Sequence, residues 1–147
     1  MTGGRRGGRR PARPRVVTFD ASIAVQWFAN EPGADAAARL IEGDEVLLAP
    51  DIMPVEAANA WWKKVRRREM EPGDLGQAIV NLLALGIEWV PTTSVLARAA
   101  EMAVELGHPV YDCVYLVLSS VRGARLATAD DRLRQAAAHH GVRLWTP

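Results

Sequence analysis

Four acidic side chains are spaced along this sequence in a way that suggests chemistry, because each lies just after a short apolar run or near the start of a helix-like pattern. Carboxylates that converge on one pocket without compensating cations repel one another, and a divalent cation is the usual way to offset that repulsion. Oxygen ligands without a histidine or cysteine cluster favour Mg²⁺ or Mn²⁺. The four candidate catalytic and metal-binding residues are Asp20, Glu56, Asp112 and Asp130.

Three short polar side chains near these acids could support such a site. Ser22 lies two residues after the first acid, and Asn59 lies about one helical turn beyond the second. Thr128 precedes the last acid by two residues, a spacing that places both side chains on the same side of a strand. Each of the three is explained equally well as a cap or as a helix-surface residue, so both interpretations stay open.

Each acid by itself also has a structural interpretation. Asp112 and Asp130 could cap the helices that begin beside them, with their charges at the positive end of the helix dipole. Glu56 could be an ordinary acid in the first turn of a helix. The catalytic interpretation therefore depends on all four carboxylates meeting at one place.

A basic stretch follows two adjacent tryptophans in the middle of the chain. Its residues could contact RNA or a partner, or they could form the solvated face of a helix. Aromatic side chains dominate binding hot spots, so the tryptophans are candidate docking anchors, with core packing as the alternative. The basic residues are Lys63, Lys64, Arg66 and Arg67, followed by Arg68, and the tryptophans are Trp27, Trp61 and Trp62.

Short apolar runs alternate with helix-like patterns, and these elements must position the polar residues. The alternation predicts an α/β fold with a mostly parallel central sheet and helices on both faces. Ligands in such folds bind at the carboxyl ends of the strands, the edge where all four acids are expected. The predicted strands are 16–19, 46–49, 88–90, 125–128 and 142–145, and the predicted helices are 22–29, 34–41, 54–69, 74–85, 94–106, 110–121 and 131–139.

Local signals give these helices expected ends and faces. Pro72 and Gly73 are predicted to break the chain between two helices, and Asp74 and Ser94 are expected to act as N-caps. In the helix predicted over 54–69, an apolar face recurs at spacings of three and four residues. That face consists of Val55, Ala58, Trp62 and Val65.

The length and composition describe one soluble domain. The chain has 147 residues, of which 49% are apolar and 24% are charged. Its single cysteine, Cys113, excludes an intramolecular disulfide, fits a reducing compartment and is expected to be a small core residue. Since no run of about 20 apolar residues suggests a membrane span, we expect a cytoplasmic protein.

The first 15 residues differ in composition from the rest of the chain. They contain six arginines and no acid, whereas the remaining residues carry 12 basic and 17 acidic side chains. A segment of glycine, arginine and proline cannot bury a core, so we expect a disordered basic tail over residues 1–15. Such a tail could add solubility or attract RNA.

Four short segments occur in an order that resembles a known family. They are Val17–Ser22, Val55–Ala60, Gly107–Asp112 and Ala127–Asp130. Over about residues 16–145 the chain resembles PIN-domain proteins, and most of all the VapC-type toxin ribonucleases of prokaryotic toxin–antitoxin pairs. By this resemblance residues 16–147 are a PIN-like nuclease domain, the four acids are the family's acidic quartet, and Ser22, Asn59 and Thr128 are its polar supports.

The same resemblance carries expectations about chemistry and partners. It implies a three-layer α/β/α fold, Mg²⁺ (or Mn²⁺) as cofactor, and hydrolysis of phosphodiester bonds in single-stranded or looped RNA. It also implies a VapB-type antitoxin as protein partner and self-association into a homodimer.

Two other functional classes remain alternatives. A receiver-type or phosphoryl-transfer domain needs a lysine after a late strand, whereas the only lysines, Lys63 and Lys64, lie within a predicted helix. A phosphatase with an Asp-x-Asp pair would need an acid where Ser22 stands. A non-catalytic interaction module could keep the fold, although the presence of all four acids argues against it.

Overall fold

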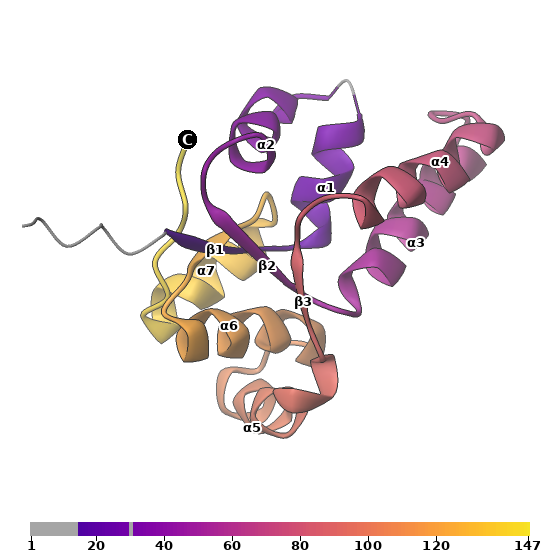
Figure 1. The fold of residues 1–147 in the computed structure, drawn as a ribbon. Coiled ribbons are helices and arrows are strands. Elements are labelled where there is room, and N and C mark those ends of the chain that lie inside the picture. Colours follow the sequence, from indigo (N-terminus) through magenta and orange to yellow (C-terminus); the bar gives the residue numbers. More distant parts are fainter. Residues whose placement is uncertain (1–14, 30) are drawn as a thin grey trace, which may run out of the picture.

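The computed structural model describes residues 15–29 and 31–147 (Figure 1). The prediction for the basic tail therefore lies outside the described residues, apart from Arg15. The strands are β1 (Val16–Phe19), β2 (Val46–Pro50), β3 (Glu88–Val90) and β4 (Arg125–Ala127). The helices are α1 (Ala21–Phe28), α2 (Ala34–Ile41), α3 (Met53–Arg66), α4 (Pro72–Leu83), the 3₁₀ helix η1 (Thr92–Ser94), α5 (Leu96–Leu106), α6 (Val110–Arg122) and α7 (Asp131–His140).

The four strands form one parallel sheet in the order β3-β2-β1-β4. Val17 of β1 pairs with Leu47 of β2 on one side and with Arg125 of β4 on the other. Residues 17–19 of β1 are buried, as expected of a central parallel strand that is covered on both faces. The predicted parallel α/β architecture is confirmed.

Helices cover the sheet on both faces (Figure 1). α1 and α2 pack against each other on one face, and α5 and α6 pack against each other on the other. α6 also contacts β1, β2, β4 and α7, while α3 packs mainly against α1 and α4. None of the described helices is long and apolar enough to cross a membrane.

One apolar core holds these layers together. Phe19 of β1, Ala49 of β2 and Leu126 of β4 are buried, and Leu116 of α6 lies in the same core. Cys113 is buried as well, which confirms its expected place in the core. The core therefore holds the C-terminal ends of β1, β2 and β4 in place, and the residues that follow these strands lie at the carboxyl edge of the sheet.

The buried face of α3 differs from the predicted one. Val55 is 67% exposed and Trp62 is 47% exposed, whereas Met53, Ala57 and Trp61 are buried. The buried residues recur every four positions and face α1, where the Trp61 ring meets the Phe28 ring edge-on at 5.2 Å between centroids. The packing of α3 against α1 therefore buries the face of α3 that is adjacent to the predicted apolar face.

The ends of two helices also differ from the prediction. α4 begins at Pro72 rather than after it, because the fixed φ of proline suits the first helical position. α5 begins at Leu96 after the η1 turn, and the Ser94 hydroxyl donates to the Pro91 carbonyl at 2.6 Å instead of capping α5.

Residues 142–145 do not form the predicted fifth strand. Leu144 makes one isolated parallel bridge to Leu126. The backbone pairing is confined to Leu126, whose N–H donates to the Arg143 carbonyl at 2.9 Å and whose carbonyl accepts from the Trp145 N–H at 2.8 Å.

Candidate active site

Asp20 directly follows β1 and caps the N-terminus of α1. It is 7% exposed. Its Oδ1 accepts hydrogen bonds from the backbone N–H and the hydroxyl of Ser22, and its Oδ2 accepts one from the Thr128 hydroxyl at 2.6 Å. Both carboxylate oxygens are thus held in place, one by the start of α1 and the other by the end of β4.

Ser22 and Thr128 connect the two strand ends as well as supporting Asp20. The Ser22 hydroxyl oxygen accepts a hydrogen bond from the Ala129 N–H at 2.9 Å, and the Thr128 hydroxyl oxygen accepts one from the Asp130 N–H at 3.0 Å. These bonds fix the turn that carries Asp130 relative to Asp20. Two of the three predicted polar supports therefore lie in direct contact with the acids or their backbone.

Glu56 lies in the first turn of α3 and contacts a residue that the sequence analysis missed. The Tyr115 hydroxyl donates a hydrogen bond to Glu56 Oε1 at 2.7 Å, and Tyr115 is buried on α6. The only available signal was position, because Tyr115 comes three residues after Asp112 and therefore shares its helix face. A tyrosine in an apolar helix is as readily explained by core packing as by a functional role, so the sequence alone did not single it out.

The sequence analysis also allowed Asp112 and Asp130 to be helix caps, and the structure supports this for Asp130 but not for Asp112. Asp130 does cap α7, because its Oδ1 accepts a hydrogen bond from the Arg132 N–H at 2.9 Å. Asp112 does not cap α6, because the N-cap position belongs to Pro109 and Asp112 lies inside the first turn. α6 leads into β4, so its first turn lies at the carboxyl edge of the parallel sheet.

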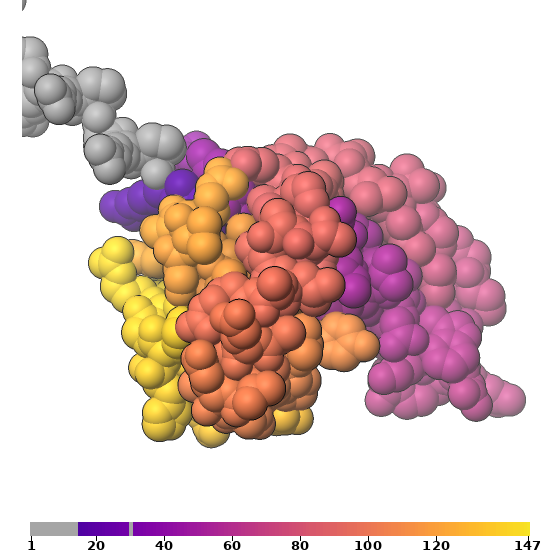
Figure 2. Space-filling model, turned by 90° about the horizontal axis from the view of Figure 1, so that it is seen from below, coloured from indigo at the N-terminus to yellow at the C-terminus, as the bar shows by residue number. Residues whose placement is uncertain are grey.

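All four acids line one cleft with a volume of about 1040 Å³. Ser22 and Asn59 line it too, α3 contributes Lys63 and Lys64, and Arg67 follows directly after the last residue of α3. In Figure 2 the surface is hollowed between the orange part of the chain and the magenta part, which come from the two sides of this cleft. The cleft therefore has an acidic floor and basic side chains along α3.

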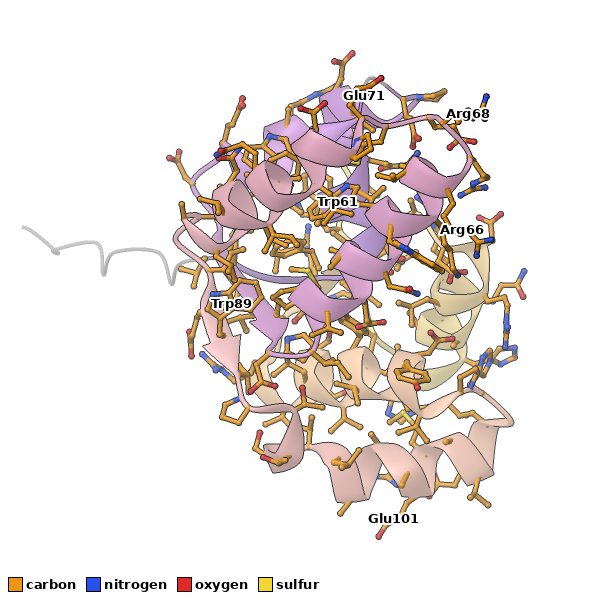
Figure 3. The ribbon with its side chains drawn as sticks, turned by 90° about the vertical axis from the view of Figure 1, so that its right-hand side faces the viewer. Trp61, Arg66, Arg68, Glu71, Trp89 and Glu101 are labelled. Carbon is orange, nitrogen blue, oxygen red and sulfur yellow. The ribbon has the colours of Figure 1, made fainter. Side chains whose placement is uncertain are left out.

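The remaining candidate contact residues lie in different surroundings. Lys64 forms an ion pair with Glu31, so its charge is partly compensated. Arg66 does not line the cleft and instead lies over the ring of Trp62, 5.1 Å from its centroid. Figure 3 shows Arg66 on the outward side of α3 and Trp61 among the helices.

The tryptophans separate in the same way. Trp61 is 1% exposed, so its prediction as a docking anchor is wrong and the core alternative holds. Trp27 is half-buried and packs edge-on against Phe28. Trp62 is the most exposed of the three, at 47%.

Burial and mutual repulsion govern the electrostatics of the cleft. Burial raises the pKa of Asp20, and its hydrogen bonds from Ser22 and Thr128 oppose that rise. Burial also raises the pKa of Glu56, with further contributions from the charges of Asp20 and Asp112. Partial burial, followed by the charge of Asp130, raises the pKa of Asp112. The charges of Arg132 and His108 oppose the rise at Asp112, yet the pKa values of Asp20, Glu56 and Asp112 are all raised.

The donor set suits a hard divalent cation. It consists of oxygen atoms, and within residues 15–29 and 31–147 none of the four carboxylates forms an ion pair with a lysine, arginine or histidine. In that same part of the chain, no three or more histidine, cysteine or acidic side chains are already arranged to hold a metal ion. Mg²⁺ commonly uses only one or two carboxylates and keeps several waters, so it fits such a cleft better than a metal that needs a preformed cage.

Comparison with known proteins agrees with the fold. The PIN domain family model matches residues 17–139. Ribonuclease VapC12 of Mycobacterium tuberculosis is 30% identical over 125 residues, which cover 85% of this chain and 95% of that protein. Ribonuclease VapC3 of Pyrobaculum aerophilum is 29% identical over 123 residues, which cover 81% and 92% of the two chains.

Solved structures show the same fold at lower sequence identity. The crystal structure of PAE2754 from Pyrobaculum aerophilum has a TM-score of 0.65 and 22% identity, covering 83% of this chain and 79% of the other. That of VapBC2 from Rickettsia felis, bound to a DNA fragment from its promoter, has a TM-score of 0.59 and 12% identity, covering 88% and 97%. The family match over most of the chain, together with relatives covered almost end to end, shows that this chain belongs to the PIN domain family and is a VapC-type member of it.

Proposed function

We propose that this protein is a Mg²⁺- or Mn²⁺-dependent endoribonuclease that acts as the toxin of a VapBC-type toxin–antitoxin pair. The observation that carries the proposal is the convergence of four carboxylates in one cleft with no ion-pair partner in the described part of the chain. The relatives named as VapC ribonucleases support the type of reaction.

The four acids have different places in this proposal. Asp20 and Asp112 would hold the first ion, and Glu56 and Asp130 would complete its shell directly or through waters. The chemistry that such an ion supplies when bound is activation of a water and polarisation of the scissile phosphate. Asp20 would bind the ion in a fixed orientation, because Ser22 and Thr128 hold both of its oxygens by hydrogen bonds.

RNA is the substrate that the walls of the cleft favour. The phosphates of an entering strand would lie along the α3 side, near Lys63 and Arg67. A single strand or a loop can bring its backbone to a recessed carboxylate floor, which a regular duplex cannot do easily. Hydrolysis then adds a water oxygen to phosphorus, breaks one P–O ester bond and places a proton on the leaving oxygen.

A protein partner follows from the hazard of the proposed activity. An uncontrolled ribonuclease would damage its own cell, so we propose a VapB-type antitoxin that covers the cleft. The likeness of this chain to the VapBC2 structure from Rickettsia felis supports this partner. We also propose a homodimer, and light scattering that shows only monomer at high protein concentration would count against it.

Two charge-removing variants test the nuclease proposal. Asp20→Asn and Asp112→Asn should abolish RNA cleavage in the presence of Mg²⁺ or Mn²⁺ and should relieve growth inhibition in cells, while circular dichroism shows folded protein. Asp35→Asn is the matched control, because Asp35 is an exposed acid in the first turn of α2 and does not line the cleft. Full cleavage in excess chelator, or by either cleft variant, would refute the proposal.

A further inference from the structure

Tyr115 places a buried hydroxyl against one of the four cleft acids. It is 2% exposed, and its hydroxyl donates to Glu56 Oε1 at 2.7 Å. A phenylalanine could fill the same core space, so packing alone does not require the hydroxyl. A buried polar group without a partner is unfavourable, and here Glu56 provides that partner.

The hydrogen bond connects two elements that each carry a cleft acid. Tyr115 lies on α6 three residues after Asp112, and Glu56 lies on α3. α3 otherwise packs mainly against α1 and α4, and this bond ties its first turn to α6. It thereby sets where Glu56 stands relative to Asp112.

Only one oxygen of Glu56 is used in this bond. Oε1 accepts from Tyr115, whereas Oε2 has no hydrogen bond to any residue that the structure describes. Asp130 shows the same division, because its Oδ1 accepts from the Arg132 N–H. Such an arrangement holds a carboxylate in one orientation and leaves its second oxygen for a ligand of the cleft.

We infer that Tyr115 is a positioning residue of the candidate site, which holds Glu56 through Oε1 so that Oε2 serves the cleft. The inference rests on the proposed function, because it assigns Tyr115 to the cation and substrate site of that reaction. Groups that orient metal-binding carboxylates typically contribute about 10- to 100-fold to metal affinity or activity. Removal of the hydroxyl should therefore lower both quantities by at least about tenfold.

The test is a double-mutant cycle with two readouts. Wild type, Tyr115→Phe, Glu56→Gln and the double variant are compared in the full chain for Mn²⁺ affinity by titration calorimetry and for the kcat of RNA cleavage. Ser119→Ala is the matched control, because its buried hydroxyl on the same helix donates to the Tyr115 carbonyl at 2.8 Å and contacts none of the acids. Circular dichroism melts confirm that every variant is folded at the assay temperature.

A positioning role predicts a particular pattern. Tyr115→Phe weakens Mn²⁺ binding and kcat in the wild-type background but adds little to Glu56→Gln, because the group that it orients is already altered. Ser119→Ala leaves both readouts at the wild-type level. A purely structural role would lower the melting temperature of Tyr115→Phe while leaving Mn²⁺ affinity and kcat unchanged, and that result would overturn the inference.

The outcomes also separate this inference from the proposed function. If wild type binds Mn²⁺ and cleaves RNA while Tyr115→Phe matches it in both, only the role of Tyr115 is refuted. If wild type neither binds Mn²⁺ nor cleaves RNA, the proposed function fails and the positioning role falls with it. Equal losses from Tyr115→Phe in the wild-type and Glu56→Gln backgrounds would show that Tyr115 acts independently of Glu56, which also contradicts the inference.

Discussion

In the absence of metal, the effect of Asp20→Asn on the free energy of unfolding should change sign between acidic and neutral pH. Burial raises the pKa of folded Asp20 above its ordinary value, so the folded protein binds a proton more tightly than the unfolded chain does. The resulting stabilisation is fully present below the unfolded pKa and is lost as the pH rises through the folded pKa. The raised pKa values of Glu56 and Asp112 act in the same direction. Asp20→Asn removes the contribution of Asp20 to this dependence.

The hydrogen bonds of Asp20 set the opposing term. Asparagine Oδ1 can still accept both bonds from Ser22, but its amide nitrogen would take the place of Oδ2 beside the Thr128 hydroxyl. Thr128 would then accept rather than donate, and its own proton would lose its partner, at a cost of about 1 kcal/mol. Each unit by which folding raises a carboxyl pKa is worth about 1.4 kcal/mol at neutral pH. We therefore expect Asp20→Asn to be more stable than wild type at pH 7, where burial disfavours the ionised carboxylate. Toward pH 4, where protonation removes that disadvantage, we expect the variant to be less stable by about the 1 kcal/mol of the lost hydrogen bond.

Thermal melts in chelator at the two pH values provide the measurement. A change of about 1 kcal/mol corresponds to about 3 °C in Tm for a domain of this size, with opposite signs at pH 7 and pH 4. Asp35→Asn, at an exposed site on α2, should show no such reversal. If Asp20→Asn is less stable than wild type at both pH values, the Asp20 carboxylate is a stabilising cap and hydrogen-bond acceptor, and the reasoning from buried repelling acids is refuted.

Three further predictions concern metal, core and tail. Adding Mg²⁺ should raise the Tm of wild type at pH 7 and change that of Asp20→Asn much less, since only a ligand that binds the native state stabilises it; equal shifts in differential scanning fluorimetry would contradict this. Trp61→Ala should destabilise the fold by about 3–5 kcal/mol in urea titrations because it empties a buried site, whereas Trp62→Ala should cost less than about 1 kcal/mol. Removing residues 1–14 should leave the Tm unchanged, provided that Arg15 is kept, because the Arg15 carbonyl accepts a hydrogen bond from the Val46 N–H at 2.8 Å. Weaker RNA binding with a flatter salt dependence in the shortened protein would identify the tail as an RNA-binding arm. A lower Tm would show that the tail belongs to the fold.

Local patterns in the sequence determined the class of fold and the edge at which the acids lie. An apolar run followed by Asp20 places that acid at the end of a buried strand, and parallel strands bring all their carboxyl ends to one edge. The C-terminal ends of two helices were also determined by local sequence. Gly107 and Gly141 end α5 and α7 with φ of 65° and 75°, a region that glycine enters more readily than other residues.

The hydrogen-bond partners of the site residues could not be predicted from local sequence patterns. The Thr128 hydroxyl meets Asp20 across 108 residues of sequence, and the Tyr115 hydroxyl meets Glu56 across 59. Such pairs form only after the strand order has placed β4 beside β1 and the helices have packed on the sheet. Nothing in the spacing of the residues specifies that order.

Trp61 and Trp62 illustrate the same limit within a single helix. They are neighbours in sequence with the same chemistry, and the apolar spacing along α3 favoured the burial of Trp62. The structure buries Trp61 against Phe28 and leaves Trp62 47% exposed. A helix with apolar residues on two adjacent faces can pack by either one, so the surface offered by α1 decided which tryptophan entered the core.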